Sequence, residues 1–372
     1  MKRILILFLT ASLTTQIGCS QNSERIEKIR LDAFFDTLER NNKFMGNVAV
    51  AHGKELIYTK SVGFIDIEHG MKANENSKYR IGSISKTFTT VLIFKAIEEN
   101  RLNLNQAIDI FFPKIENANK ITIKHLLLHR SGICNFTDNE SYLSWNTQSK
   151  TEQEMIEIIS NAGSDFEPDK KASYSNSNFV LLTYILEKIY NDPYSKLLEE
   201  KIIEPIGLKN TYYGKKINVK DNECNSYKYM EIWKFNSGTN SSVSSGEGRW
   251  KIEPETDMSI PLGAMGIVSM PVDLTIFSEA LFNEKLVSIN SLNEMKTIKD
   301  GFGMGLIQMP FCGRTGFGHS GNIDGFVSLF VYFPDSNISI AYTSNGMNHN
   351  ENDIITILLN VVYGEPFKVP EL

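Results

Sequence analysis

Strand-forming segments lie near both ends of this chain, and a helix-rich stretch separates them. Residues 47–51 and 56–62 are short runs of apolar and β-branched residues joined by a turn with Gly53, a pattern typical of a β-hairpin. Residues 326–333 are apolar on both alternating faces, as in a central strand covered by helices, and 338–343 return after a turn. Strands therefore bracket a helical insertion, which indicates the α+β class.

Helical periodicity recurs through the rest of the chain. Thr151 and Glu154 form a capping box, which predicts a helix that begins there and runs through Ile159. The stretch 237–248 is rich in Ser and Gly and predicts a mobile loop. Helical spacing of apolar residues predicts further helices over 24–42, 83–99, 177–190, 194–203 and 352–363.

The length of 372 residues suits one large bilobed unit or two domains. We expect one folded region, 24–372, with a sheet-containing lobe from about 24–100 and 260–372 and a mainly helical lobe from about 101–259. Hydrophobic residues make up 41% of the chain and charged residues 22%, as in soluble globular proteins. The formal net charge is −6 and no cluster of Lys and Arg stands out, so we expect no nucleic-acid partner.

The first residues have the pattern of an export signal. A basic pair at 2–3 precedes the apolar run 4–9, which is too short to span a bilayer as a stable helix. We expect residues 1–18 to be cleaved as a signal peptide, because 16–19 (QIGC) resembles a bacterial lipoprotein box in which Cys19 takes a lipid. Ordinary cleavage with an incidental Cys19 is the alternative. The protein is then exported, either periplasmic or attached to the membrane as a lipoprotein.

No metal or cofactor is expected. The three other cysteines, Cys134, Cys224 and Cys312, leave at least one free thiol, and one disulfide among them stays open. No CxxC spacing suggests zinc or redox chemistry. His125 and His129 have the spacing of a zinc pair, but their spacer is three leucines, without the Glu of a metalloprotease. We expect both histidines to be buried in the core.

A single Ser-x-x-Lys tetrad begins at Ser83 and ends at Lys86. Residues i and i+3 of a helix share a face, so the lysine amine can reach the serine hydroxyl. A buried lysine kept neutral by desolvation can remove the proton from Ser83 and make it a nucleophile. Unpaired N–H groups at a helix start also favour developing negative charge. Taken alone, an N-cap serine beside a solvated lysine would be the better interpretation.

The one Tyr-x-Asn motif, Tyr174-Ser175-Asn176, lies in a polar loop just before a predicted helix. The Tyr174 phenol can relay a proton between Ser83 and a leaving group. Asn176 can bind a substrate amide and hold Lys86 in place. Without the other motifs, a turn tyrosine and a helix-capping asparagine would explain these residues.

The third motif is His319-Ser320-Gly321, which precedes the strand that starts at Phe326. A glycine here lets a substrate backbone lie against the strand edge. The backbone N–H of Asn322 can then join that of Ser83 as an oxyanion hole. A surface-loop histidine is the alternative for His319.

Together these motifs and their flanks resemble the penicillin-recognising serine hydrolases. The branch in question holds class C β-lactamases, D-Ala-D-Ala carboxypeptidases, D-aminopeptidases and related esterases. The similarity runs from about residue 25 to the C-terminus and is weakest between about 214 and 260. It is carried by residues 78–88 (KYRIGSISKTF), 121–132 (ITIKHLLLHRSG), 205–208 (PIGL), 263–274 and 318–326 (GHSGNIDGF).

The resemblance implies an antiparallel sheet flanked by helices on both faces, an inserted mainly helical lobe, and an active site between them. It implies that Ser83 is acylated and that Lys86 and Tyr174 share the proton transfers. His319 stands where the family often has lysine. A histidine of ordinary pKa, about 6.5, is mostly neutral at pH 7 and offers no permanent cation to a substrate carboxylate.

The leading hypothesis is therefore a serine hydrolase that forms an acyl-enzyme on Ser83 and hydrolyses amide or ester bonds of D-amino-acid peptides or small esters. Its partner is a small-molecule, peptide or ester substrate. Two alternatives remain: a class C-like β-lactamase, and a non-catalytic penicillin-binding-type protein.

Overall fold

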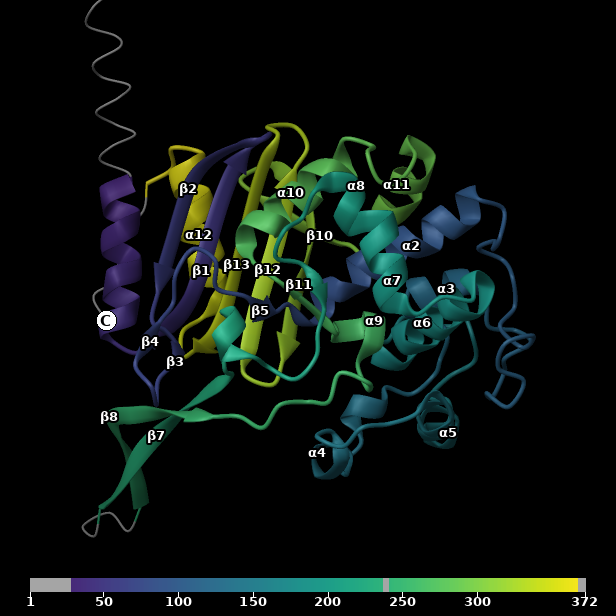
Figure 1. Ribbon diagram of the computed structural model, residues 1–372, viewed down its shortest axis with the longest axis horizontal. Coiled ribbons are helices and arrows are strands. Elements are labelled where there is room, and N and C mark those ends of the chain that lie inside the picture. The colour runs from purple at the N-terminus through teal and green to yellow at the C-terminus, as the bar shows by residue number, and fades with distance from the viewer. Residues whose placement is uncertain (1–27, 237–240, 367–372) are drawn as a thin grey trace, which may run out of the picture. The chain divides into compact units, whose positions relative to one another are not determined.

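The computed structural model describes residues 28–236 and 241–366 (Figure 1). The predicted signal peptide and Cys19 lie outside these residues. The chain divides into two compact units. The larger is 42–348, and the smaller is formed by the two ends, of which 28–41 and 349–366 are described. No helix in the described ranges is long and apolar enough to cross a membrane.

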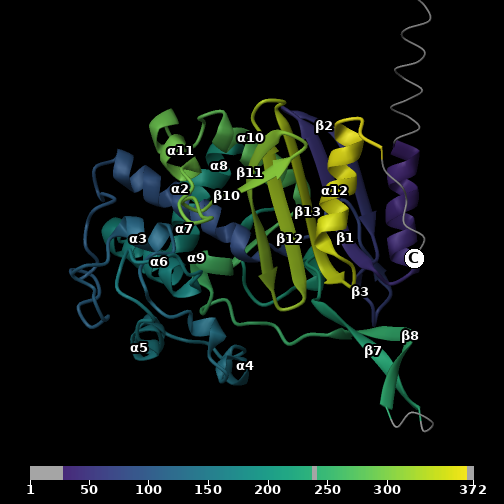
Figure 2. The same cartoon turned by 180° about the vertical axis from the view of Figure 1, so that it is seen from behind.

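A six-stranded antiparallel sheet is the centre of the larger unit (Figures 1 and 2). Its strand order places the N-terminal hairpin beside the C-terminal strands, since β1 pairs with β13 along its whole length. Strands at the two ends of the chain thus form one sheet, and the predicted hairpin and strand pair are confirmed. In sheet order the strands are β10 (Ile307–Phe311), β11 (Arg314–Ile323), β12 (Phe326–Phe333), β13 (Ile338–Met347), β1 (Phe44–His52) and β2 (Glu55–Val62).

Helix α10 (Pro271–Phe282) packs across β12, β13 and β1. Its Phe277 meets Phe330 of β12 edge to face, with ring centroids 6.1 Å apart. The same ring stacks on Phe88 of α2 (Ser85–Glu98), with centroids 3.7 Å apart. All three rings are fully buried, so one aromatic cluster joins the sheet to the helix that carries Lys86 in its first turn.

Between β5 (Tyr79–Arg80) and β9 (Ile267–Ser269), most of the regular secondary structure is helical. The capping box at Thr151 is present, because its hydroxyl accepts from the Glu154 N–H and the Glu154 carboxylate accepts from the Thr151 N–H. The helices predicted over 177–190 and 194–203 are confirmed. The helices of this stretch are α2, α3 (Ile123–Leu127), α4 (Tyr142–Trp145), α5 (Glu152–Ala162), α6 (Asn176–Tyr190), α7 (Tyr194–Leu198) with the π-turn Glu199–Ile203, α8 (Glu204–Ile206) and α9 (Leu262–Met265); α11 (Ile289–Lys296) follows α10.

The prediction of a loop over 237–248 is wrong for its second part. Residues from Ser241 onward belong to β8 (Ser241–Ile252), which pairs antiparallel with β7 (Tyr227–Asn236). Backbone hydrogen bonds to β7 stabilise this strand, and the Ser/Gly-rich composition of the segment does not predict them. Two small sheets complete the larger unit: β5-β9-β6, with β6 at Tyr212–Tyr213, and β3 (Phe64–Asp66) with β4 (Met71–Lys72).

The smaller unit contains the first and last helices of the described chain. The first spans 28–40 and the last is α12 (Glu351–Val362), so both predicted terminal helices are confirmed where the structure describes them. Asn350 caps α12 through its side chain, which accepts from the Asn352 N–H. Each helix has a buried apolar face, with Phe34 and Leu38 on the first and Ile354 and Leu358 on α12.

Candidate active site

Ser83 lies in the 3-10 turn Gly82–Ile84 that leads into α2. The predicted helix start is thus correct, with a tighter turn around the serine itself. Gly82 has φ +50°, and a Cβ there would come within 2.6 Å of the Asn322 nitrogen. Only a glycine allows this backbone conformation and this close approach together. Ser83 is 8% exposed and sits where the turn meets β11.

Lys86 lies in the first turn of α2 and is completely buried. Its Nζ is 3.0 Å from Ser83 Oγ, 2.7 Å from Asn176 Oδ1 and 2.9 Å from the Ala264 carbonyl oxygen. Desolvation holds the pKa of the Lys86 amine well below its usual range. The environment therefore favours the neutral amine.

Tyr174 approaches from the loop before α6, and its hydroxyl donates to Ser83 Oγ at 2.7 Å. Burial raises the pKa of this phenol far above 10, so it stays protonated at ordinary pH. The Lys86 amine lies 4.8 Å from the centroid of the tyrosine ring. Tyr174, 91 positions after Ser83, thus joins Ser83 and Lys86 in one hydrogen-bonded group.

Asn176 is the first residue of α6 and contacts Lys86 with its amide oxygen. Its Nδ2 donates to Thr137 Oγ1 at 3.0 Å, and its backbone N–H donates to Asn135 Oδ1 at 2.9 Å. The bond from Nδ2 fixes the orientation of the side-chain amide, with its oxygen toward the lysine, and the backbone bond holds the start of α6. Asn176 Oδ1 thus lies 2.7 Å from the Lys86 amine, and its role in holding the lysine stays a prediction.

The third motif lies on β11, directly beside the serine turn. A Cβ on Gly321 would lie 2.1 Å from the Ile81 carbonyl oxygen and 2.9 Å from the Ser83 nitrogen. The glycine therefore lets β11 touch the turn, which brings the Asn322 amide next to that of Ser83. Ser320 is half-buried on the same strand.

His319 is buried, 6% exposed, and its Nδ1 is 2.5 Å from the Ser320 carbonyl oxygen. A carbonyl oxygen only accepts, so Nδ1 carries the proton. Burial, together with the nearby Lys86, lowers the pKa of His319 to about 4. The alternative of a surface-loop histidine is wrong, and the expected ordinary pKa is corrected downward. His319 is therefore neutral throughout the physiological range.

Two aromatic residues beside Tyr174 were not assigned to the site from sequence. His129 was expected in the core, and it is buried, but its ring stacks on Tyr174 with centroids 4.4 Å apart. Phe302 lies 6.1 Å from the Tyr174 ring and 5.1 Å from the His129 ring, between centroids. The glycine-rich stretch around Phe302 was the one available signal, because it marks a close backbone approach to α2 at Gly305. The expectation of a buried core position is wrong for His125. It is half-buried at the start of α3, because its ring accepts from the Thr122 N–H in the capping box of that helix.

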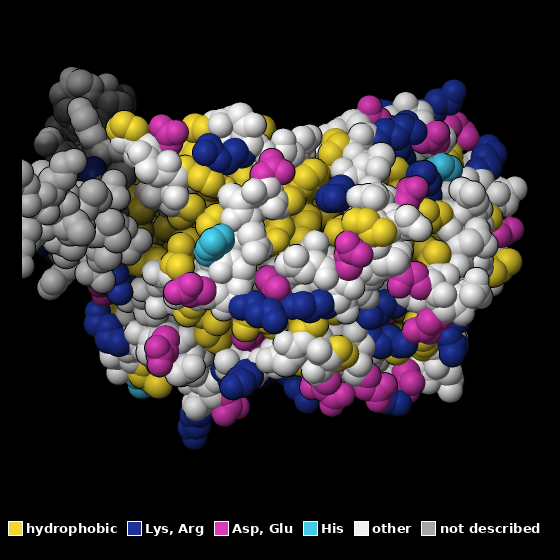
Figure 3. Space-filling model, turned by 90° about the horizontal axis from the view of Figure 1, so that it is seen from above, with side chains coloured by type: hydrophobic (Ala, Val, Ile, Leu, Met, Phe, Trp, Pro, Cys, Tyr) yellow, Lys and Arg dark blue, Asp and Glu magenta, His cyan; other side chains and the backbone are white. Residues whose placement is uncertain are grey.

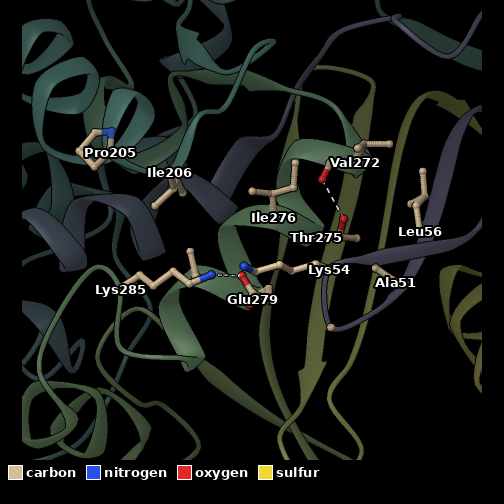
Figure 4. Close-up of a pocket in the computed structure, with 12 residues that line it drawn as sticks. Ala51, Lys54, Leu56, Pro205, Ile206, Val272, Thr275, Ile276, Glu279 and Lys285 are labelled. Atoms are coloured by element: carbon tan, nitrogen blue, oxygen red, sulfur yellow. Dashed lines mark hydrogen bonds and ion pairs between the residues drawn. The ribbon is translucent and has the colours of Figure 1, made fainter.

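The described part of the chain contains no group of three His, Cys, Asp or Glu side chains arranged to hold a metal ion. Cys134, Cys224 and Cys312 are free thiols. A pocket of about 400 Å³ lies between the β1–β2 turn, α8 and α10, and none of the motif residues lines it (Figure 4). It combines apolar walls with the ion pair of Glu279 and Lys285, whose charged atoms are 2.6 Å apart. Figure 3 shows hydrophobic side chains in the middle of one face, with both basic and acidic side chains around them.

Comparison with known proteins places this geometry in a family. The family described as Beta-lactamase matches residues 31–362. Penicillin-binding protein 4* of Bacillus subtilis (strain 168) is 27% identical over 360 residues, covering 92% of this chain and 77% of that protein. Teichoic acid D-alanine hydrolase of Staphylococcus aureus (strain MRSA252) is 26% identical over 194 residues, covering 52% of this chain and 47% of that protein.

The fold is shared with solved structures. A D-stereospecific amidohydrolase from Streptomyces sp. superposes with a TM-score of 0.72 at 23% identity, covering 92% of this chain and 99% of that one. The expected antiparallel sheet with an inserted helical part is thereby confirmed, and the family match over residues 31–362 confirms the resemblance to penicillin-recognising serine hydrolases. Because the family match spans nearly the whole described chain, this protein belongs to the beta-lactamase family and is a hydrolase.

Proposed function

We propose that this protein is a serine acyl hydrolase in which Ser83 is the nucleophile and Lys86 the base that activates it. The observation that carries this proposal is the set of contacts around the Lys86 amine. Two of them are oxygens that only accept, Asn176 Oδ1 and the Ala264 carbonyl. A neutral amine has two N–H groups and one lone pair, so with both N–H groups donated the lone pair faces the hydroxyl of Ser83, 3.0 Å away.

Tyr174 supplies the complementary acid. Because burial keeps its phenol protonated, it donates to Ser83 Oγ and is not a base in the resting enzyme. Two groups with opposite pKa displacements beside one nucleophile support a division into base and acid.

The proposed reaction has two halves. In the first, the Ser83 proton passes to Lys86, Oγ bonds to the substrate carbonyl carbon, and the oxyanion accepts from the backbone N–H groups of Ser83 and Asn322. The bond to the leaving group then breaks as Tyr174 protonates that group, and Lys86 returns a proton to the phenol. In the second half, the proton transfers run in reverse: Tyr174 passes its proton to Lys86 and takes one from water, whose oxygen bonds to the acyl carbon. The bond between the acyl carbon and Ser83 Oγ then breaks as Lys86 returns a proton to Oγ, which releases the acid and restores Ser83.

We further propose that the substrates are amides or esters of D-amino acids whose reacting end carries no obligatory carboxylate. The relatives named as a D-alanine hydrolase and a D-stereospecific amidohydrolase support the D-amino-acid class. The neutral His319 supports the second part, because it provides no cation for a carboxylate. Ser320 and Gly321 then bind the substrate backbone along β11, together with Asn176.

Two alternatives from the same family make different predictions. A class C-like β-lactamase differs in how fast water attacks the acyl-enzyme, and a non-catalytic penicillin-binding-type protein binds without turnover. The retention of Ser83, Lys86 and Tyr174 in one hydrogen-bonded group argues against loss of catalysis.

A substrate panel tests the proposal. Wild-type protein and Ser83→Ala are compared on a D-alanyl nitroanilide, a short-chain nitrophenyl ester, a D-Ala-D-Ala peptide and a chromogenic cephalosporin, with fluorophosphonate labelling in parallel. We expect Ser83-dependent labelling and turnover of the first two substrates. Fast cephalosporin turnover would favour the β-lactamase, and labelling unchanged in Ser83→Ala would remove Ser83 as the nucleophile.

We also propose that the protein is exported, on the strength of the basic pair and apolar run at its N-terminus. Lipidation of Cys19 is the finer proposal. Mass spectrometry of the mature N-terminus distinguishes a lipidated Cys19 from an ordinary signal-peptidase product.

A further inference from the structure

The backbone on both sides of Tyr174 is bonded to one residue, His129. The Ser173 N–H donates to the His129 carbonyl oxygen at 2.9 Å, and the Ser175 N–H donates to His129 Nδ1 at 3.1 Å. Between these two bonds, the imidazole stacks on the Tyr174 ring at 4.4 Å between centroids, with the planes 30° apart. Backbone and side chain of a single histidine therefore hold the tyrosine from three directions.

We propose that His129 is a positioning residue that fixes the Tyr174 hydroxyl at Ser83 and so determines the rate of acylation. This inference rests on the proposed function, in which Tyr174 is the acid. It assigns no chemical step to His129 itself.

The backbone at His129 supports a specific role for its side chain. It directly follows the C-cap of α3, Leu128, with φ +54°, the left-handed conformation that usually selects glycine or asparagine after a helix. A glycine would adopt it without strain but would provide neither the acceptor for Ser175 nor the ring under Tyr174. Such strained residues persist where the surrounding structure requires them, often at functional sites.

The protonation state of His129 agrees with a positioning role. Nδ1 accepts from the Ser175 N–H, so a neutral imidazole carries its proton on Nε2. Burial, with Lys86 and His319 nearby, holds the pKa of His129 well below its usual range. The ring stays neutral as Ser83 is activated and does not compete with Lys86 for the proton.

Three substitutions separate the parts of this contact. In His129→Asn the amide oxygen stands near the position of Nδ1 and the residue tolerates positive φ, so the Ser175 bond is kept. In His129→Gln the amide reaches toward Nε2 and the bond is lost. His129→Phe keeps the ring without the acceptor. We expect His129→Asn to retain most of the labelling rate. His129→Gln and His129→Phe should label more slowly and lose about 10²-fold in kcat with little change in KM, as for a displaced catalytic group.

The matched control is His125→Gln, four residues earlier on α3, where His125 Nδ1 accepts from the Thr122 N–H as part of a capping box. A glutamine at this position keeps that bond, so α3 and the backbone leading to His129 stay in place. This variant should label at the wild-type rate. The dependence of the remaining rate on pH should keep its shape in every His129 variant, because His129 does not titrate in the working range. Thermal unfolding identifies variants that fail to fold; if Phe does, the Asn–Gln comparison alone decides.

Three results would contradict the inference. Equal labelling rates in Asn, Gln and Phe, with wild-type labelling still dependent on Ser83, would overturn the role of His129 and leave the proposed function intact. A pH limb that disappears in His129→Gln would make His129 the titrating base, against a positioning role. Wild-type labelling that does not depend on Ser83 would overturn the proposed function and this inference together.

Discussion

The amine of Lys86 lies 3.0 Å from the hydroxyl oxygen of Ser83, and carbonyl oxygens occupy its other two hydrogen-bonding directions. Replacing it in Lys86→Met should slow acylation by about 10²–10⁴-fold, the usual contribution of a general base. The change also leaves buried acceptors unsatisfied, which costs about 1–3 kcal/mol for each. Labelling rates and urea unfolding measure the two effects. Lys95→Met, later on the same helix, is the control, and an undiminished labelling rate in Lys86→Met would remove the lysine as the base.

The pH dependence of acylation should follow the lowered pKa of Lys86. The active form is the neutral amine, so the rate declines as pH falls through the pKa in the folded protein, which desolvation holds well below 10.5. Above that value the rate should be level until Tyr174 or the fold itself titrates. Fluorophosphonate labelling between pH 5 and pH 10 measures the profile. A rate that rises tenfold per pH unit up to pH 10 would show a lysine of ordinary pKa.

His319 should make the fold sensitive to mild acid. The pKa of His319 is lowered from 6.5 to about 4 in the folded protein. Between these pH values the histidine is protonated in the unfolded chain but neutral in the folded protein. Stability from this residue is present above pH 6.5 and falls as pH drops toward 4. At about 1.4 kcal/mol per pH unit, the loss is about 3 kcal/mol at most. Urea unfolding at several pH values gives the free energy of unfolding as a function of pH. Between pH 6.5 and 4 this free energy should fall less steeply in His319→Gln than in wild type, and an equal fall would contradict the prediction.

The same neutral imidazole predicts how substrate affinity responds to pH. A histidine of ordinary pKa would bind a substrate carboxylate while it is protonated. KM would then rise as pH passes about 6.5, because the histidine loses its charge. With the pKa of His319 at about 4, KM for a D-Ala-D-Ala peptide should stay flat from pH 5.5 to 8. His319→Lys should lower this KM by supplying a cation, without doing so for an uncharged ester. A wild-type KM that rises near pH 6.5 would show that the histidine binds the carboxylate.

How far the sequence predicts this site depends on the range of each interaction. Helical spacing shows that Lys86 can reach Ser83, although the tetrad alone favoured a solvated lysine, and the strands at the chain ends follow from their composition. The contact between Lys86 and the Ala264 carbonyl joins residues 178 positions apart, and no local pattern encodes it. The same holds for the contacts of His129 on both sides of Tyr174. His129 lies 46 positions before Ser175 and reaches it only because the residue after the end of α3 has a left-handed conformation.

The misjudged segment has a related cause. Residues 237–248 carry few apolar side chains, so neither alternation nor helical spacing marks them, yet from Ser241 they pair with β7. Strand formation there depends on the partner strand, which propensity does not contain. The sequence likewise could not predict the lowered pKa of His319, because it comes from burial in the folded protein and from the proximity of Lys86, which is far away in sequence.

A buried ion pair connects the two segments that supply the proposed oxyanion hole. Arg80, three residues before Ser83, lies 3.2 Å from Asp324 on the turn after β11, and the side chains are 2% and 4% exposed. Arg80→Met leaves the Asp324 carboxyl buried without its cation, a change that typically costs about 3–5 kcal/mol.

We expect Arg80→Met to lower both stability and labelling rate, because the backbone N–H groups of Ser83 and Asn322 lose their common anchor. The double variant Arg80→Met/Asp324→Asn should recover part of the stability but not the labelling rate. It removes the more deeply buried of the two carboxylates that lose the guanidinium, and the other, Glu255, which lies 2.7 Å from Arg80 in the wild type, is 29% exposed. Urea unfolding and fluorophosphonate labelling of the two singles and the double complete the cycle. Additive losses of stability would show that the two charges do not interact, and a double variant with wild-type labelling would show that the pair does not hold the oxyanion segments together.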